Sequence, residues 1–217
     1  MLKKVVVFDN GYGGELFANY VEDEMPILEV IRVIDWLGSA NFYKNSYQAR
    51  HETLSSLRPY LGRVDLIMVA NHLVSETSLK FLRHKYPDQK FSGFTIEKPI
   101  TSKAERALIL TTKASYDTFE HRAIKRRLGL KTRELICDHW AKLIDEGSLT
   151  RAIIEQDLAK FQAFKPQLII IGCAQLVEIK PILRRIYGPT VGISDGYKTA
   201  LKSICKELGL RGGSGKK

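Results

Sequence analysis

Four short apolar runs stand out along the chain and predict buried β-strands. Each run is rich in Leu or β-branched residues and is bounded by small or polar residues, which is typical of the central strands of a parallel sheet. The segments between them repeat apolar residues at helical spacing. The alternation of strands and helices predicts βαβ units and an α/β fold with a parallel sheet. The four runs are Val5–Phe8, Leu66–Ala70, Ala107–Leu110 and Leu168–Ile171.

The predicted strands recur at a constant offset, which indicates a duplicated layout. Asp9 follows the first strand and Asn71 the second, 62 positions later (71 − 9). Thr111 follows the third strand and Cys173 lies just beyond the fourth, again 62 positions later (173 − 111). The two halves are thus offset by 102 positions (173 − 71), although few residues are identical between them. A further pair of strand-like segments fits the same offset: Glu29–Asp35 and Lys131–Cys137.

This duplication predicts two similar α/β lobes whose parallel sheets face a central cleft. We expect residues 1–95, together with a C-terminal helix at about 196–210, to form the N-terminal lobe, and residues 96–195 to form the second lobe. Residues 211–217 are rich in Gly and Lys and are expected to form a flexible tail. Ligands of open α/β sheets bind at the carboxyl ends of the strands, so Asn71 and Cys173 are expected at equivalent positions of the cleft.

The first strand leads into a glycine-rich turn. The segment Asp9-Asn10-Gly11-Tyr12-Gly13-Gly14 precedes a helix expected to begin near Glu15. Free N–H groups near a helix start can hold a carboxylate or phosphate, but the spacing is not that of a dinucleotide fingerprint. The segment is therefore interpreted as a ligand site beside an acid, with a tight turn and a capped helix as the alternative.

Two further polar residues follow buried strands. His72, next to Asn71, is either a ligand-binding group or a structural histidine. Cys173 comes after a glycine and before a helix expected from about Val177, where the helix dipole lowers the pKa of a thiol. By contrast, Cys205 falls on an apolar helix face and is expected in the core, and Cys137 remains undecided.

Composition narrows the class of protein. With 217 residues, 44% hydrophobic and 27% charged residues, the chain is an ordinary globular protein rather than a disordered one. Three widely spaced cysteines, with no C-x-x-C pair, argue against a disulfide framework and against a structural zinc site. No signal peptide or membrane span is visible, so a cytoplasmic location is expected. The net charge of +10 fits a nucleic acid, an anionic membrane surface or an anionic substrate, or no specific partner at all. A basic run at Lys125–Arg127 is more typical of a solvated helix face than of a binding patch.

At the three strand ends, the chain resembles the cofactor-independent aspartate/glutamate racemase family, and its glutamate racemases in particular. The family pattern Phe-Asp-Ser-Gly-x-Gly-Gly is similar to Phe8–Gly14, Ala-Cys-Asn-Thr-Ala-Ser to Ala70–Ser75, and Leu-Gly-Cys-Thr-His-Tyr-Pro to Ile171–Val177. Segments Lys180–Ile182 and Val191–Gly196 resemble later family motifs. The resemblance runs in order over nearly the whole chain and implies the two-lobed fold predicted above.

The resemblance also implies a chemistry and a set of site residues. In the family, one thiolate removes the Cα proton of an amino acid and a thiol on the other face returns one, with no cofactor. By position, Cys173 matches the second cysteine, Asp9 the acid near the first, and Asp145 a glutamate near the second. The implied substrate-binding residues are Asn10, Phe42, Tyr43, Asn71, Ser75, Thr111, Thr112, Ala174 and Gln175.

Several family positions are changed. Asn71 replaces the first cysteine, His72 the following asparagine, and Gln175 a histidine. Because an amide is neither an acid nor a base at neutral pH, the two-thiol reaction is not intact, and His72 is the candidate replacement base. We expect a divergent glutamate racemase-like enzyme that supplies D-glutamate to the cell wall. A one-thiol decarboxylase or lyase of the same fold, and a catalytically dead binding protein, are the alternatives.

The partners expected from this interpretation are few. The ligand is a small anionic amino acid or dicarboxylate, since the family binds such molecules through backbone N–H groups and hydroxyls. Neither a cofactor nor a metal ion is implied, and no membrane contact is expected. Nucleic acid is disfavoured because no recognised binding motif is visible. A homodimer is left open.

Overall fold

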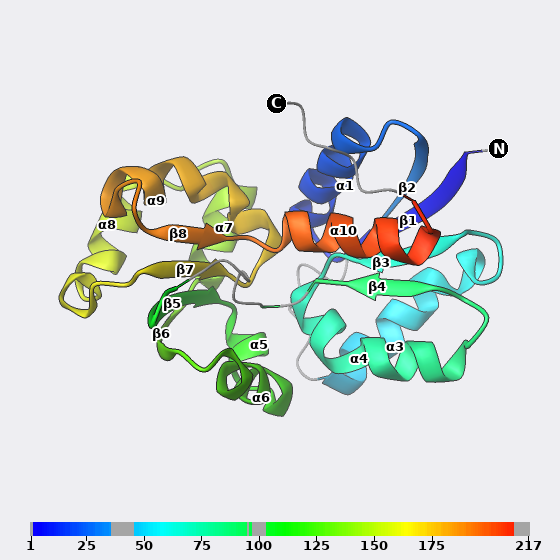
Figure 1. The fold of residues 1–217 in the computed structure, drawn as a ribbon, viewed down its shortest axis with the longest axis horizontal. Helices are drawn as coiled ribbons and strands as arrows, with labels where there is room; N and C mark the ends of the chain where they lie inside the picture. Colours follow the sequence, from blue (N-terminus) through cyan, green and yellow to red (C-terminus); the bar gives the residue numbers. More distant parts are fainter. Residues whose placement is uncertain (1, 36–45, 95, 97–102, 211–217) are drawn as a thin grey trace. The chain divides into compact units, whose positions relative to one another are not determined.

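The computed structural model describes residues 2–35, 46–94, 96 and 103–210 (Figure 1). The chain divides into two compact units. The first comprises Met1–Thr95 and Gly196–Lys217, and the second comprises Ile96–Asp195. We call them the first and second lobes. The chain therefore leaves the first lobe once and returns to it for its last helix.

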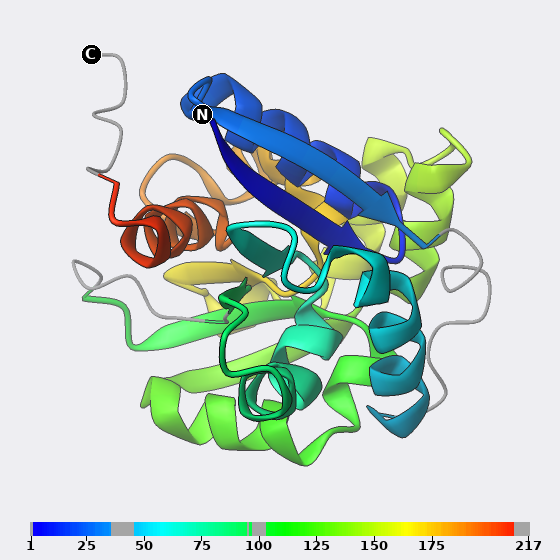
Figure 2. The same cartoon turned by 90° about the vertical axis from the view of Figure 1, so that its right-hand side faces the viewer.

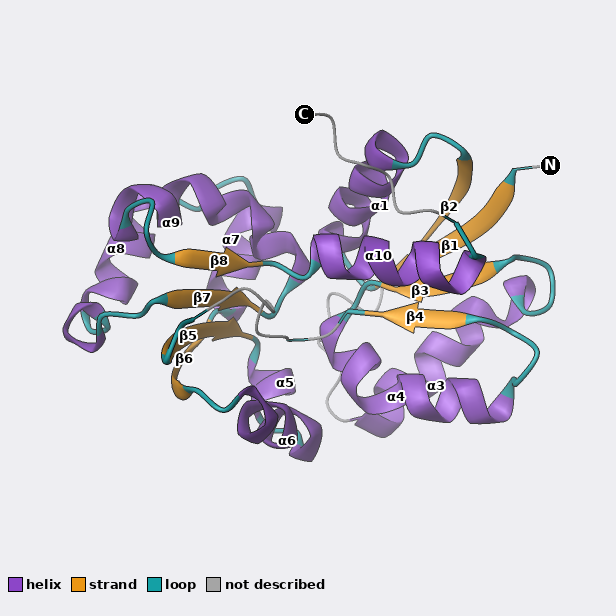
Figure 3. Cartoon of the chain, in the orientation of Figure 1, coloured by secondary structure: helices purple, strands orange, loops and turns teal. Residues whose placement is uncertain are grey.

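The first lobe is built on a four-stranded parallel sheet. The strand order is β2-β1-β3-β4, and the long strands β1 and β2 run side by side (Figure 2). The last helix of the chain, α10, packs against β3 and β4 (Figure 3). The elements are β1 (Lys3–Asp9), α1 (Tyr12–Glu24), β2 (Leu28–Ile34), α3 (Ser46–Leu57), the 3-10 turn η1 (Arg58–Tyr60), β3 (Leu66–Val69), α4 (His72–Lys85), β4 (Phe91–Gly93) and α10 (Tyr197–Leu208).

The second lobe repeats this sheet. Its strand order is β6-β5-β7-β8, and all neighbouring strands are again parallel. The helices are shorter than those of the first lobe, and two of the connections contain 3-10 turns. The elements are β5 (Arg106–Thr111), α5 (Lys113–Tyr116), α6 (Phe119–Leu128), β6 (Lys131–Ile136), α7 (Asp138–Asp145), α8 (Arg151–Ala159), η2 (Gln162–Phe164), β7 (Leu168–Ile171), η3 (Ala174–Ile179), α9 (Lys180–Tyr187) and β8 (Gly192–Ser194).

The strand register is identical in the two lobes, which confirms the predicted pair of similar α/β lobes. Val5 pairs with Leu66 and Ala107 with Leu168, a separation of 61 in both cases (66 − 5 and 168 − 107). The outer pairs behave alike, with separations of 25 for the second strands (28 − 3 and 131 − 106) and 24 for the fourth (91 − 67 and 192 − 168). The 102-residue repeat is therefore a repeat of hydrogen-bonded structure.

The predicted central strands form the cores of the sheets. The residues of Val5–Phe8 and Leu66–Val69 are 0% exposed, as expected for strands covered on both faces. The sequence pattern missed β4 and β8, because three-residue edge strands carry no apolar run. Helix α1 begins at Tyr12, three residues before the predicted start, and η3 begins at Ala174 rather than at Val177.

Two negative findings apply only to the residues that the structure describes. No helix there is long and apolar enough to cross a membrane. Likewise, no group of three or more His, Cys, Asp or Glu side chains in that part could hold a metal ion. Phe42, Tyr43 and the predicted tail 211–217 lie outside the described residues.

Candidate functional site

A polar cluster occupies the carboxyl end of the sheet in the first lobe. Asp9 ends β1 and is 5% exposed, and its Oδ1 accepts the backbone N–H of Asn10 at 2.7 Å. The Asn71 amide Nδ2 donates to the same Oδ1 at 3.1 Å and also to Oδ1 of Asn10. Three residues that the sequence analysis singled out are thus joined by hydrogen bonds.

Asn71 also caps a helix. It precedes α4 with an extended backbone, and its Oδ1 accepts the backbone N–H of Val74 at 2.9 Å. This is the usual capping interaction of an N-terminal Asn, and it stabilises a helix by about 1 kcal/mol. Both ends of the Asn71 amide are therefore occupied by structural hydrogen bonds, in keeping with a residue that holds groups in place and transfers no proton.

The glycine-rich turn has a packing role at this cluster. A Cβ on Gly14 would lie 2.5 Å from the Cβ of Asp9 and 2.7 Å from Cδ1 of Ile34. Helix α1 can therefore approach β1 and β2 only because position 14 has no side chain. Gly14 and Gly13 lie inside the first turns of α1, and Gly11 is its N-cap, so they do not form an open loop before the helix.

His72 lies in the interior of the first lobe. It is the first residue of α4, is 4% exposed, and stacks on the ring of Phe94 with centroids 4.8 Å apart. Phe94 in turn contacts the rings of Phe17 and Tyr197. Nearby, Ser75 donates its hydroxyl to the carbonyl of Val69 at 2.9 Å. His72 and Ser75 are thus placed in the packing between α4 and the sheet.

In the second lobe, Cys173 stands at the equivalent strand end. It follows β7 with an extended backbone, is half-buried, and is the N-cap of η3 without a side-chain cap. The preceding Gly172 is tightly enclosed, because a Cβ there would lie 3.0 Å from the carbonyl oxygen of Leu110 and 3.2 Å from Cδ1 of Ile96. The backbone of β5 therefore lies directly against the residue that precedes the thiol.

The other two cysteines are inaccessible. Cys137 is 0% exposed, and its thiol donates to the carbonyl of Leu135 at 3.3 Å. Burial raises the pKa of the Cys137 thiol far above its ordinary value, and the neighbouring Cys173 raises it further. Cys205 is 3% exposed on the buried face of α10, which confirms its predicted place in the core. Cys173 is therefore the accessible thiol of the three.

The second-lobe residues implied by the family resemblance have distinct local roles. Thr111 ends β5 with 0% exposure, and Thr112 caps α5 by accepting the N–H of Ser115 at 3.3 Å. Ala174 is buried in η3, and Gln175 donates its amide to the carbonyl oxygen of Ala141 at 2.7 Å. This bond fixes η3 to α7.

Asp145 is the last residue of α7 and is exposed at the surface. Desolvation of its carboxyl raises its pKa, and the adjacent charge of Glu146 raises it further. A carboxyl with a raised pKa is a better proton acceptor than an ordinary aspartate. Cys137, which acts on Cys173 across the two strand ends, could not be predicted from the sequence, because it follows a different strand and no motif joins the two cysteines.

The two lobes thus present different chemistry at one structural position. Asn71 and Cys173 both follow the third strand of their sheets, 102 positions apart (173 − 71), and both are N-caps. The first lobe offers a carboxylate and two amides that can hold polar groups. The second offers a thiol, which becomes a strong nucleophile and a base when it ionises to the thiolate.

The chain is similar in sequence to several glutamate racemases, at low identity. The glutamate racemase of Vibrio cholerae is 24% identical over 224 residues, which cover 99% of this chain and 84% of that protein. Shorter matches to the glutamate racemases of Koribacter versatilis (24% over 116 residues) and Campylobacter concisus (32% over 66 residues) cover 50% and 30% of this chain. These two matches span only 40% and 25% of those proteins. No model of a known protein family matches the sequence.

Solved structures share the fold over almost the whole chain. The Escherichia coli glutamate racemase bound to L-glutamate and the activator UDP-MurNAc-Ala gives a TM-score of 0.84 at 18% identity, covering 100% of this chain and 86% of that one. The Francisella tularensis glutamate racemase bound to D-glutamate gives 0.79 at 17% identity, with 97% and 84% covered. An aspartate racemase homologue of Pyrococcus horikoshii gives 0.60 at 14% identity, with 96% and 100% covered.

Proposed function

We propose that this chain, a divergent member of the aspartate/glutamate racemase family, acts at the Cα of a small anionic amino acid with Cys173 as its acid/base thiol. One observation carries the proposal: a half-buried thiol follows the third strand of the second lobe, while the equivalent position of the first lobe holds Asn71. Glutamate is the proposed substrate, because relatives of the same fold have been solved with L-glutamate and with D-glutamate bound. The supply of D-glutamate for cell-wall synthesis in the cytoplasm, which the family resemblance implies, requires inversion at Cα. It therefore needs a proton donor on the other face of the substrate, and Asn71 does not provide one.

The proposed reaction uses one thiol. The Cys173 thiolate removes the proton from Cα, and the developing negative charge is shared with the substrate carboxylate. Asn71 cannot return a proton to the opposite face, because an amide does not titrate and both of its ends already make hydrogen bonds. Proton exchange should therefore be much faster for one enantiomer than for the other.

The remaining site residues take supporting roles in this proposal. Asp9, Asn10 and Asn71 hold polar groups of the substrate, and Thr111, Thr112, Ala174 and Gln175 form the surroundings of the thiol. Asp145, whose pKa is raised by desolvation, takes the role of the glutamate that the family has near its second cysteine, as the resemblance implies. We give His72 and Ser75 a packing role, since both are buried against Phe94 and β3. Phe42 and Tyr43 stay candidates for substrate contact from the sequence alone.

A one-thiol decarboxylation is the second candidate function. It requires only that a thiol protonate a carbanion from one face after carbon dioxide has left, so it needs no second acid or base. The observation that favours it concerns Asn71, whose amide already makes hydrogen bonds with Asp9, Asn10 and the N–H of Val74. The first lobe therefore offers no second acid or base at this position.

The test is exchange of the Cα proton in heavy water, followed by proton NMR. L-glutamate, D-glutamate, L-aspartate and D-aspartate are incubated separately with the native protein, and a malonate-type diacid is included to detect carbon dioxide release. We expect exchange of one enantiomer without inversion. Removal of the thiol in Cys173→Ala should reduce the rate by about 10³-fold, in the range of general acid–base catalysis.

Cys205→Ala is the matched control, because it removes a thiol from the buried face of α10 and leaves the strand end intact. Equal exchange rates for the native protein and a folded Cys173→Ala variant would exclude the role of the thiol. Release of carbon dioxide without exchange of any amino acid would replace the first function by the second. If neither exchange nor release occurs, both are rejected.

A further inference from the structure

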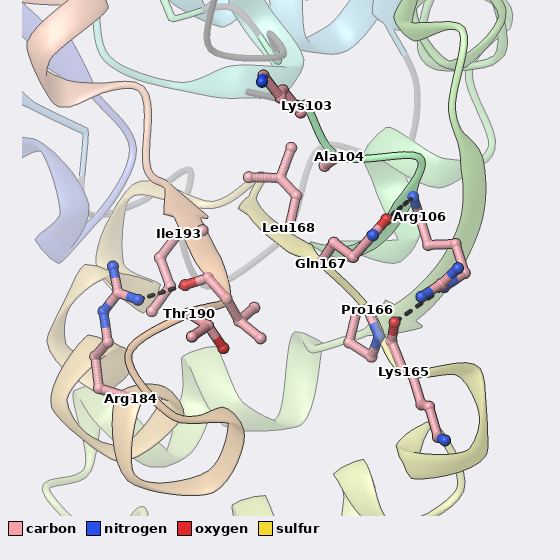
Figure 4. Close-up of a pocket in the computed structure, with 12 residues that line it drawn as sticks. Lys103, Ala104, Arg106, Lys165, Pro166, Gln167, Leu168, Arg184, Thr190 and Ile193 are labelled. Carbon is pink, nitrogen blue, oxygen red and sulfur yellow. Dashed lines mark hydrogen bonds between the residues drawn. The ribbon is translucent and has the colours of Figure 1, made fainter. Parts of the chain in front are cut away.

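The second lobe contains a hollow at the end of its sheet that lies opposite to Cys173. Arg106, Leu168 and Gly192 are the first residues of β5, β7 and β8, and all three line it. Arg106 and Leu168 are labelled in Figure 4. Cys173, by contrast, follows the carboxyl end of β7. The hollow has a volume of about 760 Å³, within the range of about 300–1,000 Å³ that is usual for small-molecule sites. It is therefore separate from the candidate catalytic site.

The lining combines positive charge with apolar surface. Its charged residues are Lys103, Arg106, Lys165 and Arg184, and none of its twelve residues is acidic. The walls between them are mainly aliphatic and include Leu168. Figure 4 shows Arg184 and Lys103 on different sides of the hollow, with Arg106 beside Lys165. Several cations around a partly apolar hollow favour an organic anion.

Both guanidinium groups are held in place by backbone carbonyls. Arg106 donates Nε to the carbonyl oxygen of Lys165 at 3.0 Å. Arg184 donates Nη1 to the carbonyl oxygens of Pro189, at 3.3 Å, and Val191. A carbonyl oxygen orients a guanidinium but does not neutralise its charge. The remaining N–H groups keep the planar arrangement that binds phosphate or carboxylate oxygens in pairs.

The rim of the hollow contains a strained lysine. Lys165 has φ 49° and ψ 64°, and it is the one non-glycine residue with positive φ in the described part of the chain. By comparison, α6 and α10 end on Gly129 and Gly209 in this conformation. A side chain other than glycine is disfavoured there, and such strain clusters at binding sites. Lys165 lines the hollow at this strained backbone position, and in Figure 4 its side chain extends away from Leu168 and Thr190.

At the equivalent end of the sheet in the first lobe, a carboxylate partly neutralises the positive charge. Asp65, 102 positions before Gln167 (167 − 65), accepts the N–H of Lys4 at 2.8 Å and pairs with Lys3 at 3.0 Å. Gln167 makes the same backbone contact, since its Oε1 accepts the N–H groups of Arg106 and Glu105 at 3.1 and 2.9 Å. The neutral amide retains the structural bond and lacks the carboxylate.

We propose that this hollow is a binding site for a small organic phosphate. The two fixed guanidinium groups bind the phosphate oxygens, Lys103 and Lys165 add positive charge at the rim, and the aliphatic wall contacts the organic part. A phosphate ester matches four basic residues better than a single carboxylate does, because it carries up to two negative charges and three terminal oxygens.

The test is isothermal titration calorimetry with pyrophosphate, ADP and citrate at low salt. We expect ADP to bind more tightly than pyrophosphate because of its organic part, and both to bind more tightly than citrate. Added salt should weaken each interaction, since exposed charges are screened. Gln167→Glu preserves both backbone contacts and adds a carboxylate beside Arg106, so it should weaken ADP binding by about tenfold or more.

Arg106→Gln tests the same site by charge removal and should also weaken ADP binding by about tenfold. Lys4→Gln is the matched control, because Lys4 has the equivalent position in the first lobe (106 − 4 is 102), and it should leave binding unchanged. Millimolar binding that is equal in the native protein and in Gln167→Glu would overturn the site. Citrate binding as tight as that of ADP would overturn the assignment to phosphate.

Discussion

The two lobes share a scaffold and differ at its ends. Strand order and register are the same in both sheets, down to the residue separation of each hydrogen-bonded pair. At the carboxyl ends, the third strand is followed by Asn71 in one lobe and by Cys173 in the other. Hydrogen bonding between the strands therefore fixes the positions of these two residues, while the chemistry of their side chains differs.

The exchange of a thiol for an amide has a structural benefit. Asn71 accepts the N–H of Val74 and caps α4, while Cys173 makes no side-chain cap to η3. An amide N-cap stabilises a helix by about 1 kcal/mol relative to a residue that cannot cap. The first lobe therefore has the more stable strand end, and the second has the more reactive one.

The second strands differ in a comparable way. Arg32 of β2 and Glu134 of β6 are 102 positions apart (134 − 32) and carry opposite charges. Arg32 pairs with Glu15 and Glu22 of α1, whereas the Glu134 side chain, only 9% exposed, contacts His121 and Lys125 of α6. Each sheet thus attaches its neighbouring helix through one ionic side chain, but with the sign reversed.

The largest expected effect comes from making the two carboxyl ends alike. Cys173→Asn copies the first-lobe residue into the second lobe. Exchange at Cα should fall by about 10³-fold, because the amide cannot carry a proton. The free energy of unfolding should stay the same or rise by up to about 1 kcal/mol if the new amide caps η3. NMR exchange and urea titration measure the two effects, and a loss of stability with unchanged exchange would contradict the expectation.

The two lobes also differ in how tightly the residue at the position of Gly14 is packed. The change Gly14→Ala places a Cβ against Asp9 and Ile34, and it should destabilise the protein by about 3 kcal/mol. Tyr116 is the residue of the second lobe that corresponds to Gly14 (116 − 14 is 102), and its side chain is 40% exposed. Tyr116→Ala is therefore the control and should change the free energy of unfolding by less than about 0.5 kcal/mol. Chemical denaturation followed by circular dichroism compares them.

Glu134 should make the second lobe sensitive to acid. Burial alone would raise the pKa of its carboxyl, but hydrogen bonds from His121 and Lys125 outweigh this and lower the pKa below its ordinary value. A carboxyl with a lowered folded-state pKa stabilises the protein above its unfolded pKa of about 4.3, and this contribution is lost as the pH falls through the folded pKa. Glu134→Gln should cost about 2 kcal/mol at pH 7.

The difference between Glu134→Gln and the native protein should shrink as the pH falls below the unfolded pKa of about 4.3 and through the lower folded pKa, where the native carboxyl is protonated too. Urea titrations at pH 7 and pH 2.5 measure it. Arg32→Gln is the comparison in the first lobe, and it should cost about 1 kcal/mol because that side chain is 30% exposed. A cost for Glu134→Gln that is the same at both pH values would refute the ionic contribution.

The smallest expected effect concerns the turn before the third strand. The first lobe has Gly62 in this turn with φ 71°, and the second lobe has Lys165 with φ 49°, one residue away from the 102-residue offset (165 − 62 is 103). Lys165→Gly should relieve strain and raise the free energy of unfolding by about 1 kcal/mol, while it weakens ADP binding through the loss of a charge. Gly62→Lys is the reverse change, with an expected cost of similar size. Thermal unfolding in the presence and absence of ADP separates the two effects.

Most of the fold could be predicted from the sequence because buried strands leave a local pattern. The predicted run Leu168–Ile171 coincides with β7, and Glu29–Asp35 differs from β2 by one residue at each end. The constant offset of 102 then fixed the duplicated topology. The short edge strands β4 and β8 could not be found in this way, since their hydrogen bonds depend on a partner strand already in place and not on their own residues.

The candidate site was less predictable, because motifs give positions and not contacts. The sequence placed Asp9, Asn71 and Cys173 at strand ends, and the structure has them there. The stacking of His72 on Phe94 could not be predicted, because Phe94 is 22 positions away (94 − 72) and its contact depends on how α4 packs on the sheet. The basic hollow was missed for the same reason, since its residues come from five separate segments.

The return of the chain to the first lobe affects the order in which the protein can fold on the ribosome. The second lobe is one continuous stretch, Ile96–Asp195, and has all its strands once that stretch has emerged. The first lobe begins earlier but must wait for α10, whose buried face includes Tyr197 and Ile204. Until then the surface against β3 and β4 is uncovered, and nascent chains of this kind are prone to aggregate. The lobe that is translated first is thus completed last.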